Sequence, residues 1–453
     1  MKWSLPIVLL SAAAVVIGKM PVAKYRALPT LREQDALEKS WVQQRYDFIP
    51  SVLKKHGYDA WILSMREYAE DTAFRSLVSS TTTFSARRRT LYLFHTHPDV
   101  PSPLHLIDNM PSMWDTVLDT LEKIDPKRIA VNIDENSAFS DGLHTGEGRL
   151  LMSKLGKWAD RVSAKREIGV EVIAARVGGE EQLEMYRLMM ENVWAMIQEG
   201  FSEKVIHVGK TTANDLVWWF RDVMRWRIGT TTWFNPTVEV YRSSSEPSVE
   251  DDPYMREGDM LHVDIGITAM GMNTDTQHLG YILRPNETSP PPSLKQGLRD
   301  SNRLQDFVRH QMTPGKTGDQ VLAAIFDDMK NAELQGLIYS HPIGDYGHSA
   351  GALIGMANIQ GPVLFGGQNK ILKNYWTSVE LAGISRVPEW GIDQQFALEE
   401  DVYWSEKTQT FEWVFGQQTD YHLIKRRQKD SEVHSSILGK LLGSLGWNIV
   451  RWT

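Results

Sequence analysis

Two aspartates stand eleven residues apart in a stretch that is otherwise mostly apolar. Asp264 and Asp275 fall within Leu261–Leu283, which reads as two β-strands joined by a turn at Gly271 and Asn273. If the strands pair as a hairpin, the two carboxylates converge on one point. Carboxylates among apolar neighbours are costly unless a cation or a proton lies between them, although each aspartate could instead brace a turn by itself. The hairpin alone therefore leaves metal binding and a structural role equally open.

Further along the chain are more side chains that can bind a metal or move a proton. His341 and His348 lie in SHPIGDYGH, Glu380 lies in TSVELA, and Glu399 lies beside Glu400 in ALEEDVY. Carboxylates supplemented by one imidazole suit Mn²⁺, Co²⁺, Zn²⁺ or Fe²⁺, and bridging carboxylates can hold two ions. Two such ions lower the pKa of a water between them and polarise a carbonyl, as peptide hydrolysis requires. Any one of these residues could be structural, but their joint occurrence favours a metal site.

The order and local sequences of these residues resemble the pita-bread metallopeptidases, the family of Xaa-Pro aminopeptidase, prolidase and methionine aminopeptidase. The resemblance covers roughly Gly178–Val414 and rests on VDIG, TDTQHLGYIL, SHPIGDYGH, VELAG and ALEEDVY, with the HPIG-x-x-GH and VPEWG pattern of an Xaa-Pro-peptidase-like subgroup. It implies a metal-dependent aminopeptidase that removes the first residue of small peptides, with Xaa-Pro peptides expected, by a metal-bridged hydroxide. It also implies two divalent ions, with Mn²⁺ expected first, and a homodimer is common in the family.

The resemblance implies a role for each matching position in metal binding. One ion would be chelated by Asp264, both would be bridged by Asp275 and Glu399, and their coordination would be completed by His341 and Glu380.

The same resemblance implies two catalytic residues. His348 is similar to the family's histidine that hydrogen-bonds the substrate carbonyl, and Glu380 is similar to the carboxylate that also acts as general base. Glu399 is preferred to Glu400 as the ligand because Ala-Leu-Glu-Glu resembles the family's Arg-Ile-Glu-Asp. Only one of two adjacent strand residues can point into the site.

The sequence also departs from the family pattern. The turn Ser243–Asp252 lacks the histidine expected upstream of the first aspartate, and His262 is too near Asp264 in sequence to be its equivalent. Ala397 stands where many relatives carry arginine, and Leu337 stands where the Xaa-Pro enzymes carry another histidine. These differences put rate and proline preference in question. A non-hydrolytic peptide-binding pseudo-enzyme on the same fold is therefore the alternative, whereas a metal-free creatine-hydrolase-like enzyme would predict replaced ligands.

Two domains are expected to position these residues in a chain of 453 residues. Residues 31–170 alternate helical and strand-like segments, which predicts an α/β domain with a mostly parallel sheet, similar in architecture to the creatinase-type N-terminal domain. Residues 178–430 interleave helices with antiparallel strands, so the expected fold class is α+β with a C-terminal pita-bread catalytic domain. The expected helices of this domain are Glu180–Glu199, Thr212–Arg227, Ser301–Met312 and Thr317–Ala332.

The two ends and the composition bear on location and partners. Lys2 and an apolar run to Gly18 predict a signal peptide at residues 1–18 and a secreted protein, with an uncleaved membrane anchor as the weaker alternative. Residues 431–453 form an amphipathic C-terminal extension with few basic residues, for which no stable membrane insertion is expected. The net charge of −8 argues against a nucleic-acid partner, the absence of cysteine excludes disulfides, and Asn286 begins a glycosylation sequon.

Overall fold

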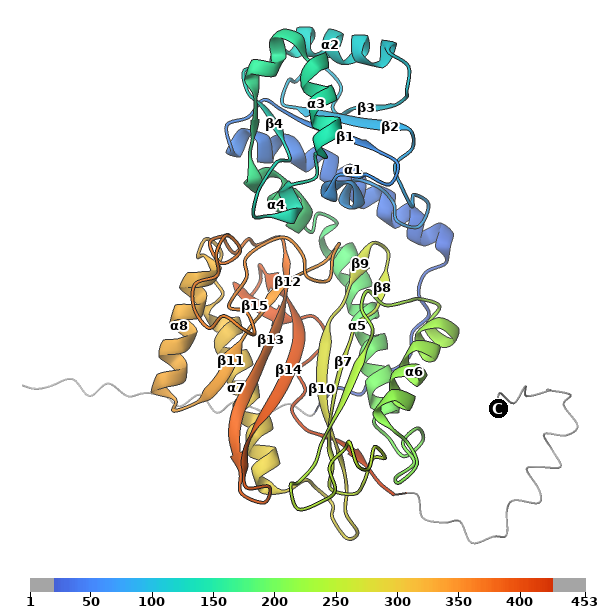
Figure 1. Ribbon diagram of the computed structural model, residues 1–453, viewed down its shortest axis with the longest axis vertical. Helices are drawn as coiled ribbons and strands as arrows, with labels where there is room; N and C mark the ends of the chain where they lie inside the picture. Colours follow the sequence, from blue (N-terminus) through green and yellow to red (C-terminus); the bar gives the residue numbers. More distant parts are fainter. Residues whose placement is uncertain (1–19, 427–453) are drawn as a thin grey trace, which may run out of the picture.

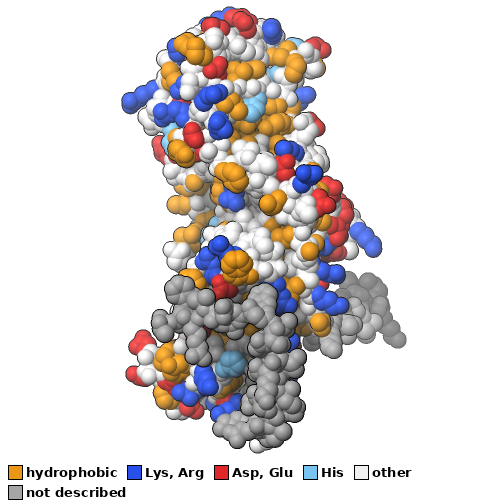
Figure 2. Space-filling view, turned by 90° about the vertical axis from the view of Figure 1, so that its right-hand side faces the viewer, with side chains coloured by type: hydrophobic (Ala, Val, Ile, Leu, Met, Phe, Trp, Pro, Cys, Tyr) orange, Lys and Arg blue, Asp and Glu red, His pale blue; other side chains and the backbone are white. Residues whose placement is uncertain are grey.

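An α/β domain and a larger α+β domain stand one above the other in the computed structural model, which describes residues 20–426 (Figure 1). The predicted signal peptide at residues 1–18 and the extension at residues 431–453 lie outside the described residues. Within the described part of the chain, every helix is too short or too polar to span a bilayer. On the face shown in Figure 2, acidic, basic and hydrophobic side chains are interspersed.

The N-terminal domain is built on a mixed five-stranded sheet in the order β3-β2-β1-β4-β5. The expectation of a mostly parallel sheet is wrong for half of it: β1 pairs in parallel with β4 and β4 with β5, but β1–β2 and β2–β3 are antiparallel. Parallel pairing needs a crossover of a dozen or more residues, and only eight residues, 96–103, connect β2 to β3. The strands are β1 (Ala60–Arg66), β2 (Arg89–His95), β3 (Leu104–Ile107), β4 (Ile129–Val131) and β5 (Val162–Ala164).

Helices cover this sheet and lead into the second domain. The long first helix starts at a capping box in which Thr30 and Glu33 each accept a hydrogen bond from the other's backbone N–H. Its apolar face, including Ile49 and Leu53, belongs to the same buried cluster as Trp61 of the sheet. The domain's helices are α1 (Leu31–Lys55), α2 (Ser112–Ile124), α3 (Thr145–Lys154) and α4 (Arg166–Ala174), with 3₁₀ turns at Thr72–Leu77, Ala138–Ser140 and Gly156–Arg161.

A strongly connected sheet of nine strands forms the centre of the C-terminal domain, with the path β11-β13-β14-β10-β7-β6. Three more strands join it at the side: β12 pairs with β13, β15 with β14, and β16 with β10. The predicted hairpin is present as β7 and β10, whose connection folds into a second small hairpin, β8–β9. The bounds are β6 (Thr237–Tyr241), β7 (Met260–Ile265), β8 (Thr268–Ala269), β9 (Met272–Asn273), β10 (Thr276–Ile282), β11 (Gln335–Ile338), β12 (His341–Ile343), β13 (Trp376–Val387), β14 (Ile392–Ser405), β15 (Thr410–Trp413) and β16 (His422–Ile424).

The helices of this domain pack on one face of the sheet, and α5 and α7 lie behind the strands in Figure 1. Three of the four expected helices are close to their predicted bounds, but the helix expected at Ser301–Met312 begins earlier, at Pro292. Proline suits the first helical position because its missing N–H would have no partner there. The helices are α5 (Gly179–Gly200), α6 (Ala213–Val223) with a π turn at Met224–Ile228, α7 (Pro292–Gln311) and α8 (Gly318–Asn331).

Strand alternation separates an apolar face from a polar one. Val263 of β7 is buried in a cluster with residues of α5, and Leu381 of β13 is buried in a cluster with residues of α7 and α8. Because successive strand residues point to opposite faces, His262, Asp264 and Glu380 project from the face without helices.

Buried ion pairs join the two domains beside this polar face. Asp345, in the loop after β12, lies 3.3 Å from Arg45 of α1 and also contacts Arg176. Burial alone would raise the pKa of Asp345, but the two arginines hold it below its ordinary value. Next to it, Tyr346 donates a hydrogen bond to the backbone oxygen of Thr72 in the N-terminal domain. The loop that carries His348, which directly follows the strand of His341, is therefore held against the upper domain.

Candidate metal centre

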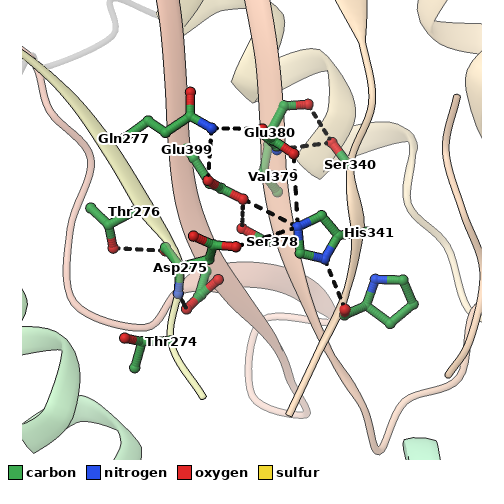
Figure 3. Close-up of polar contacts among 12 residues, drawn as sticks. Thr274, Asp275, Thr276, Gln277, Ser340, His341, Ser378, Val379, Glu380 and Glu399 are labelled. Atoms are coloured by element: carbon green, nitrogen blue, oxygen red, sulfur yellow. Dashed lines mark hydrogen bonds and ion pairs between the residues drawn. The ribbon is translucent and has the colours of Figure 1, made fainter. Parts of the chain in front are cut away.

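Four polar side chains form one row across the central strands. The register pairs Asp264 of β7 with Gln277 of β10, Gln277 with Glu399 of β14, and Glu399 with Glu380 of β13. Directly paired residues project from the same face of a sheet, so all four lie on the face without helices. Figure 3 shows Gln277, Glu399 and Glu380 turned toward one another. The pairing of strands that are distant in sequence thus gathers three of the five predicted ligands.

The two other predicted ligands, Asp275 and His341, lie beside this row. Asp275 immediately precedes β10, and His341 begins β12. The Nε2 atom of His341 lies 3.3 Å from Glu399 Oε1, 3.6 Å from Asp275 Oδ2 and 3.7 Å from Glu380 Oε2 (Figure 3). Asp264 offers a ligand atom within 4.8 Å of those of Asp275 and Glu399, so all five residues named from the sequence surround one centre.

The hydrogen bonding of His341 shows what the centre is suited to hold. Its Nδ1 lies 2.9 Å from the backbone oxygen of Pro342, which can only accept, so in the neutral imidazole that binds a metal the ring proton is on Nδ1. The lone pair of Nε2 then faces the carboxylates, and this buried atom has no hydrogen-bond partner among the described residues. The same is true of Oδ1 of Asp264 and Oδ1 of Asp275. Acceptors facing acceptors repel one another, so this donor set fits divalent cations.

The carboxylates also disturb one another's protonation. Burial, followed by the charges of Glu399, Asp264 and Glu380, raises the pKa of Asp275 well above its ordinary value. Burial and the neighbouring Glu399 do the same to the pKa of Glu380, and burial raises the pKa of Asp264 to about 6. A bound cation would favour the charged forms and relieve this repulsion.

The ligand atoms fall into overlapping groups, each within a span of 4.8 Å. One group is Asp264, Asp275 and Glu399, and another is His341, Glu380 and Glu399. Glu399 belongs to both, which is the geometry that a bridging carboxylate requires. A third group joins Asp275 and His341 to His348.

Adjacent glutamates of β14 have opposite surroundings. Glu399 points into the cluster, where Oε1 accepts from Ser378 Oγ at 2.6 Å and Oε2 accepts from Gln277 Nε2 at 3.0 Å. Glu400 points to the helix face, where it accepts a hydrogen bond from Trp194 and contacts His278. The geometry therefore favours Glu399, the residue preferred from the sequence.

His348 lies at the accessible side of the cluster. Its ring meets that of His341 edge to face, with the centroids 4.6 Å apart, and meets the ring of Trp233 in the same way at 5.2 Å. Partial burial of the ring is the main reason that the pKa of His348 is lowered to about 4. The imidazole is therefore neutral near pH 7 and can hydrogen-bond a polar group that enters the cluster.

Sequence reasoning missed the side chains that support the ligands. Gln277 and Ser378 both donate to Glu399, and Ser340 accepts from the backbone N–H of Glu380. Gln277 could have been found by strand alternation, because it lies two residues beyond Asp275. Ser378 and Ser340 carried no comparable signal, because serine is common in strands and turns.

Comparisons with known proteins identify the fold. No protein-family model matches the sequence, and no curated protein matches it significantly. Among solved structures, an X-Pro aminopeptidase from Thermotoga maritima matches with a TM-score of 0.56 and 17% identity over 82% of this chain and 98% of that chain. An Xaa-Pro dipeptidase from Bacillus anthracis matches with a TM-score of 0.57 and 14% identity over 84% and 99%.

A dipeptidase from Mycobacterium ulcerans gives a similar result, with a TM-score of 0.53 and 15% identity over 85% of this chain and 98% of that chain. Identities this low establish the fold alone. The chain has the predicted α+β pita-bread fold, preceded by an α/β domain of the creatinase type.

Proposed function

We propose that this protein is a dinuclear metal-dependent aminopeptidase that hydrolyses the N-terminal residue of small peptides, with Xaa-Pro peptides as the expected substrates. The observation that carries the proposal is the unpartnered Nε2 lone pair of His341, which faces Asp275, Glu380 and Glu399. The solved structures that share the fold are described as X-Pro aminopeptidase and Xaa-Pro dipeptidase, which favours peptide hydrolysis over other uses of such a centre.

The metal would be held by the side chains that already converge. Asp264, Asp275, His341, Glu380 and Glu399 would bind two divalent ions, with Mn²⁺ expected and Co²⁺, Zn²⁺ or Fe²⁺ as alternatives, because carboxylates with one imidazole suit all four. When bound, such ions lower the pKa of water and polarise a carbonyl group.

The reacting groups of the chain itself would be Glu380 and His348. The Glu380 side chain is 17% exposed, more than those of Asp275 and Glu399, so of these three carboxylates it is the most open to an attacking water, whose proton it would accept. The accessible ring of His348 would hydrogen-bond the substrate carbonyl and keep the peptide bond oriented toward the cluster.

The test is the release of the first residue from Xaa-Pro-Yaa peptides by protein that has been chelated and then reloaded with Mn²⁺. We expect turnover to require the metal and to be lost in Glu380→Gln, but to be retained in Glu250→Gln, a matched change of an exposed glutamate. Turnover that survives chelation would contradict the proposed mechanism.

A peptide-binding pseudo-enzyme is the second candidate, and specific positions favour it. Ala397 pairs with Ala382, which pairs with Leu337, so the two positions that lack the family's polar residues lie on either side of Ala382, near the cluster. This candidate predicts that Mn²⁺ and Xaa-Pro peptides bind without any turnover, which calorimetry and product analysis together would reveal.

Secretion and assembly are separate proposals. We propose that residues 1–18 direct export and are removed, which N-terminal sequencing of the mature protein would test. A homodimer is expected from the resemblance to the pita-bread family, and light scattering of the purified protein would test it.

A further inference from the structure

A chain of hydrogen-bonding side chains links the protein surface to two carboxylates of the metal centre. Glu239 of β6 lies 3.2 Å from Nδ1 of His262, and Nε2 of His262 lies 3.0 Å from Oε1 of Gln277. Gln277 then donates from Nε2 to Glu380 at 2.6 Å and to Glu399 at 3.0 Å. Glu239 is 55% exposed and His262 is 7% exposed, so the chain begins in solvent and ends in the buried centre.

The amide of Gln277 can adopt only one orientation in this chain. Its two N–H groups serve two carboxylates, and its oxygen is left facing Nε2 of His262. Rotating the amide by half a turn would place its oxygen against Glu380 and Glu399 and its N–H groups against the imidazole. That arrangement would exchange two charge-assisted hydrogen bonds for repulsion between acceptors.

The orientation of the His262 imidazole is also fixed by polar groups on both sides of the ring. Both of its ring nitrogens face acceptors, the carboxylate of Glu239 and the amide oxygen of Gln277. The hydrogen bond from His262 is the main reason that the pKa of Glu239 falls to about 2, so the carboxylate stays charged. Tyr241 also donates to the same carboxylate oxygen. The surface end of the chain is therefore anchored by two donors.

On the side of the row away from Ser378, the neighbouring positions of β13 and β14 carry apolar residues. Two residues along from Glu399 and Glu380 are Ala397 and Ala382, and Ala382 pairs with Leu337. In the family that the sequence resembles, arginine is usual at the position of Ala397. The donor that reaches both glutamates in this chain comes instead from β10, through Gln277.

We propose that Gln277 is the positioning residue for Glu380 and Glu399, and that His262 and Glu239 hold its amide in the orientation that this role requires. The inference rests on the proposed function, because it assigns Gln277 to the same metal centre. Gln277 would fix both carboxylates before metal or substrate binds. The positions of the ligands in such a site determine its metal affinity and the rate of hydrolysis.

The first experiment measures Mn²⁺ affinity by calorimetry and the Mn²⁺ electron paramagnetic resonance spectrum of Gln277→Leu. This variant keeps the side-chain volume but loses both donors, and we expect Mn²⁺ to bind at least about tenfold more weakly, with an altered spectrum. Gln418→Leu is the matched control, because Gln418 is also a buried glutamine that hydrogen-bonds a neighbouring strand, at Leu279. We expect the control to lose stability but to keep its Mn²⁺ affinity within about twofold.

The second experiment uses milder changes, so that the test does not depend on one variant folding. His262→Leu removes the partner of the Gln277 oxygen, whereas His262→Gln restores a donor. We expect Mn²⁺ affinity to fall about threefold to tenfold in the first and to recover largely in the second. In peptide hydrolysis both Gln277→Leu and His262→Leu should lower kcat more than they change KM, because the proposed role of both residues is to position the carboxylates.

The outcomes separate this inference from the proposed function. If the wild-type protein binds Mn²⁺ but hydrolyses no peptide, the aminopeptidase proposal fails while the affinity and spectrum still test Gln277. Unchanged Mn²⁺ affinity and spectrum in folded Gln277→Leu, or in both His262 variants, would overturn the positioning role.

Discussion

The two faces of the central sheet both carry acidic and imidazole side chains, but the faces differ in whether these side chains are hydrogen-bonded within the protein. On the helix face, Glu400 accepts from Trp194 Nε1 at 3.1 Å and lies 2.7 Å from His278 Nε2, while His278 Nδ1 lies 3.0 Å from His422 Nε2. On the other face, acceptor atoms of His341 and Asp275 have no hydrogen-bond partner among the described residues. Both faces are buried, and both combine acids with imidazoles.

The difference lies in how completely the polar atoms are paired. On the helix face each acceptor meets a donor, so the network is satisfied by the protein alone and holds α5 and β16 to the sheet. On the other face, acceptors face acceptors, and the missing positive charge has to come from outside the chain. The same residue types therefore form a structural network on one side of β14 and a candidate ligand set on the other.

The largest expected effect comes from changing a shared ligand. Glu399→Gln removes the charge that both ligand groups use, so we expect peptide turnover to fall by about a thousandfold or more, on the order of several kcal/mol in the barrier. Metal analysis should show fewer Mn²⁺ ions bound, while circular dichroism remains that of the folded protein. Full activity in this variant would show that Glu399 is not a required ligand, and the proposed contrast between a structural face and a ligand face would fail.

The neighbouring substitution should affect stability instead. Glu400→Ala leaves His278 and Trp194 without their buried partner, so we expect the free energy of unfolding to fall by about 2–4 kcal/mol in urea titrations. Mn²⁺ content should stay the same, since Glu400 points away from the ligands. If Glu400→Ala lost bound metal but no stability, Glu400 would be a metal ligand and its face of the sheet would not be the structural one.

Metal removal should sharpen the contrast. Chelation should lower the melting temperature, because Mn²⁺ at about a hundred times its Kd would stabilise the folded state by about 2.7 kcal/mol. That difference between chelated and loaded protein should largely vanish in Glu399→Gln but persist in Glu400→Ala. Calorimetric scans with and without Mn²⁺ measure both differences.

A graded effect should come from pH acting on the helix face. Burial lowers the pKa of His422 from 6.5 to about 4 and holds the pKa of His278 well below its ordinary value, so both rings stay neutral when folded. The unfolded chain takes up protons first, so stability is lost as pH falls from about 6.5 toward 4, by about 1 kcal/mol per pH unit for each histidine. His422→Leu should flatten this slope in urea titrations between pH 7 and 5.

Local patterns in the sequence determined the elements and the faces. The mostly apolar segments on either side of the turn residues Gly271 and Asn273 predicted the hairpin, and the structure confirms it with Asp264 and its neighbours in antiparallel register with β10. The cap signal at Thr212 was followed by a helix, as expected. These features depend on interactions between residues that are close in sequence, so the sequence alone is sufficient to predict them.

The pairing and register of strands that are distant in sequence were determined only by the tertiary structure. The choice between Glu399 and Glu400 and the role of Gln277 both depend on strand pairings between remote segments. Gln277 and Glu399 are 122 residues apart, and no local preference encodes their register. The sequence thus specified which side chains could bind a metal, whereas the packing of the whole sheet determined which acceptors were left facing one another.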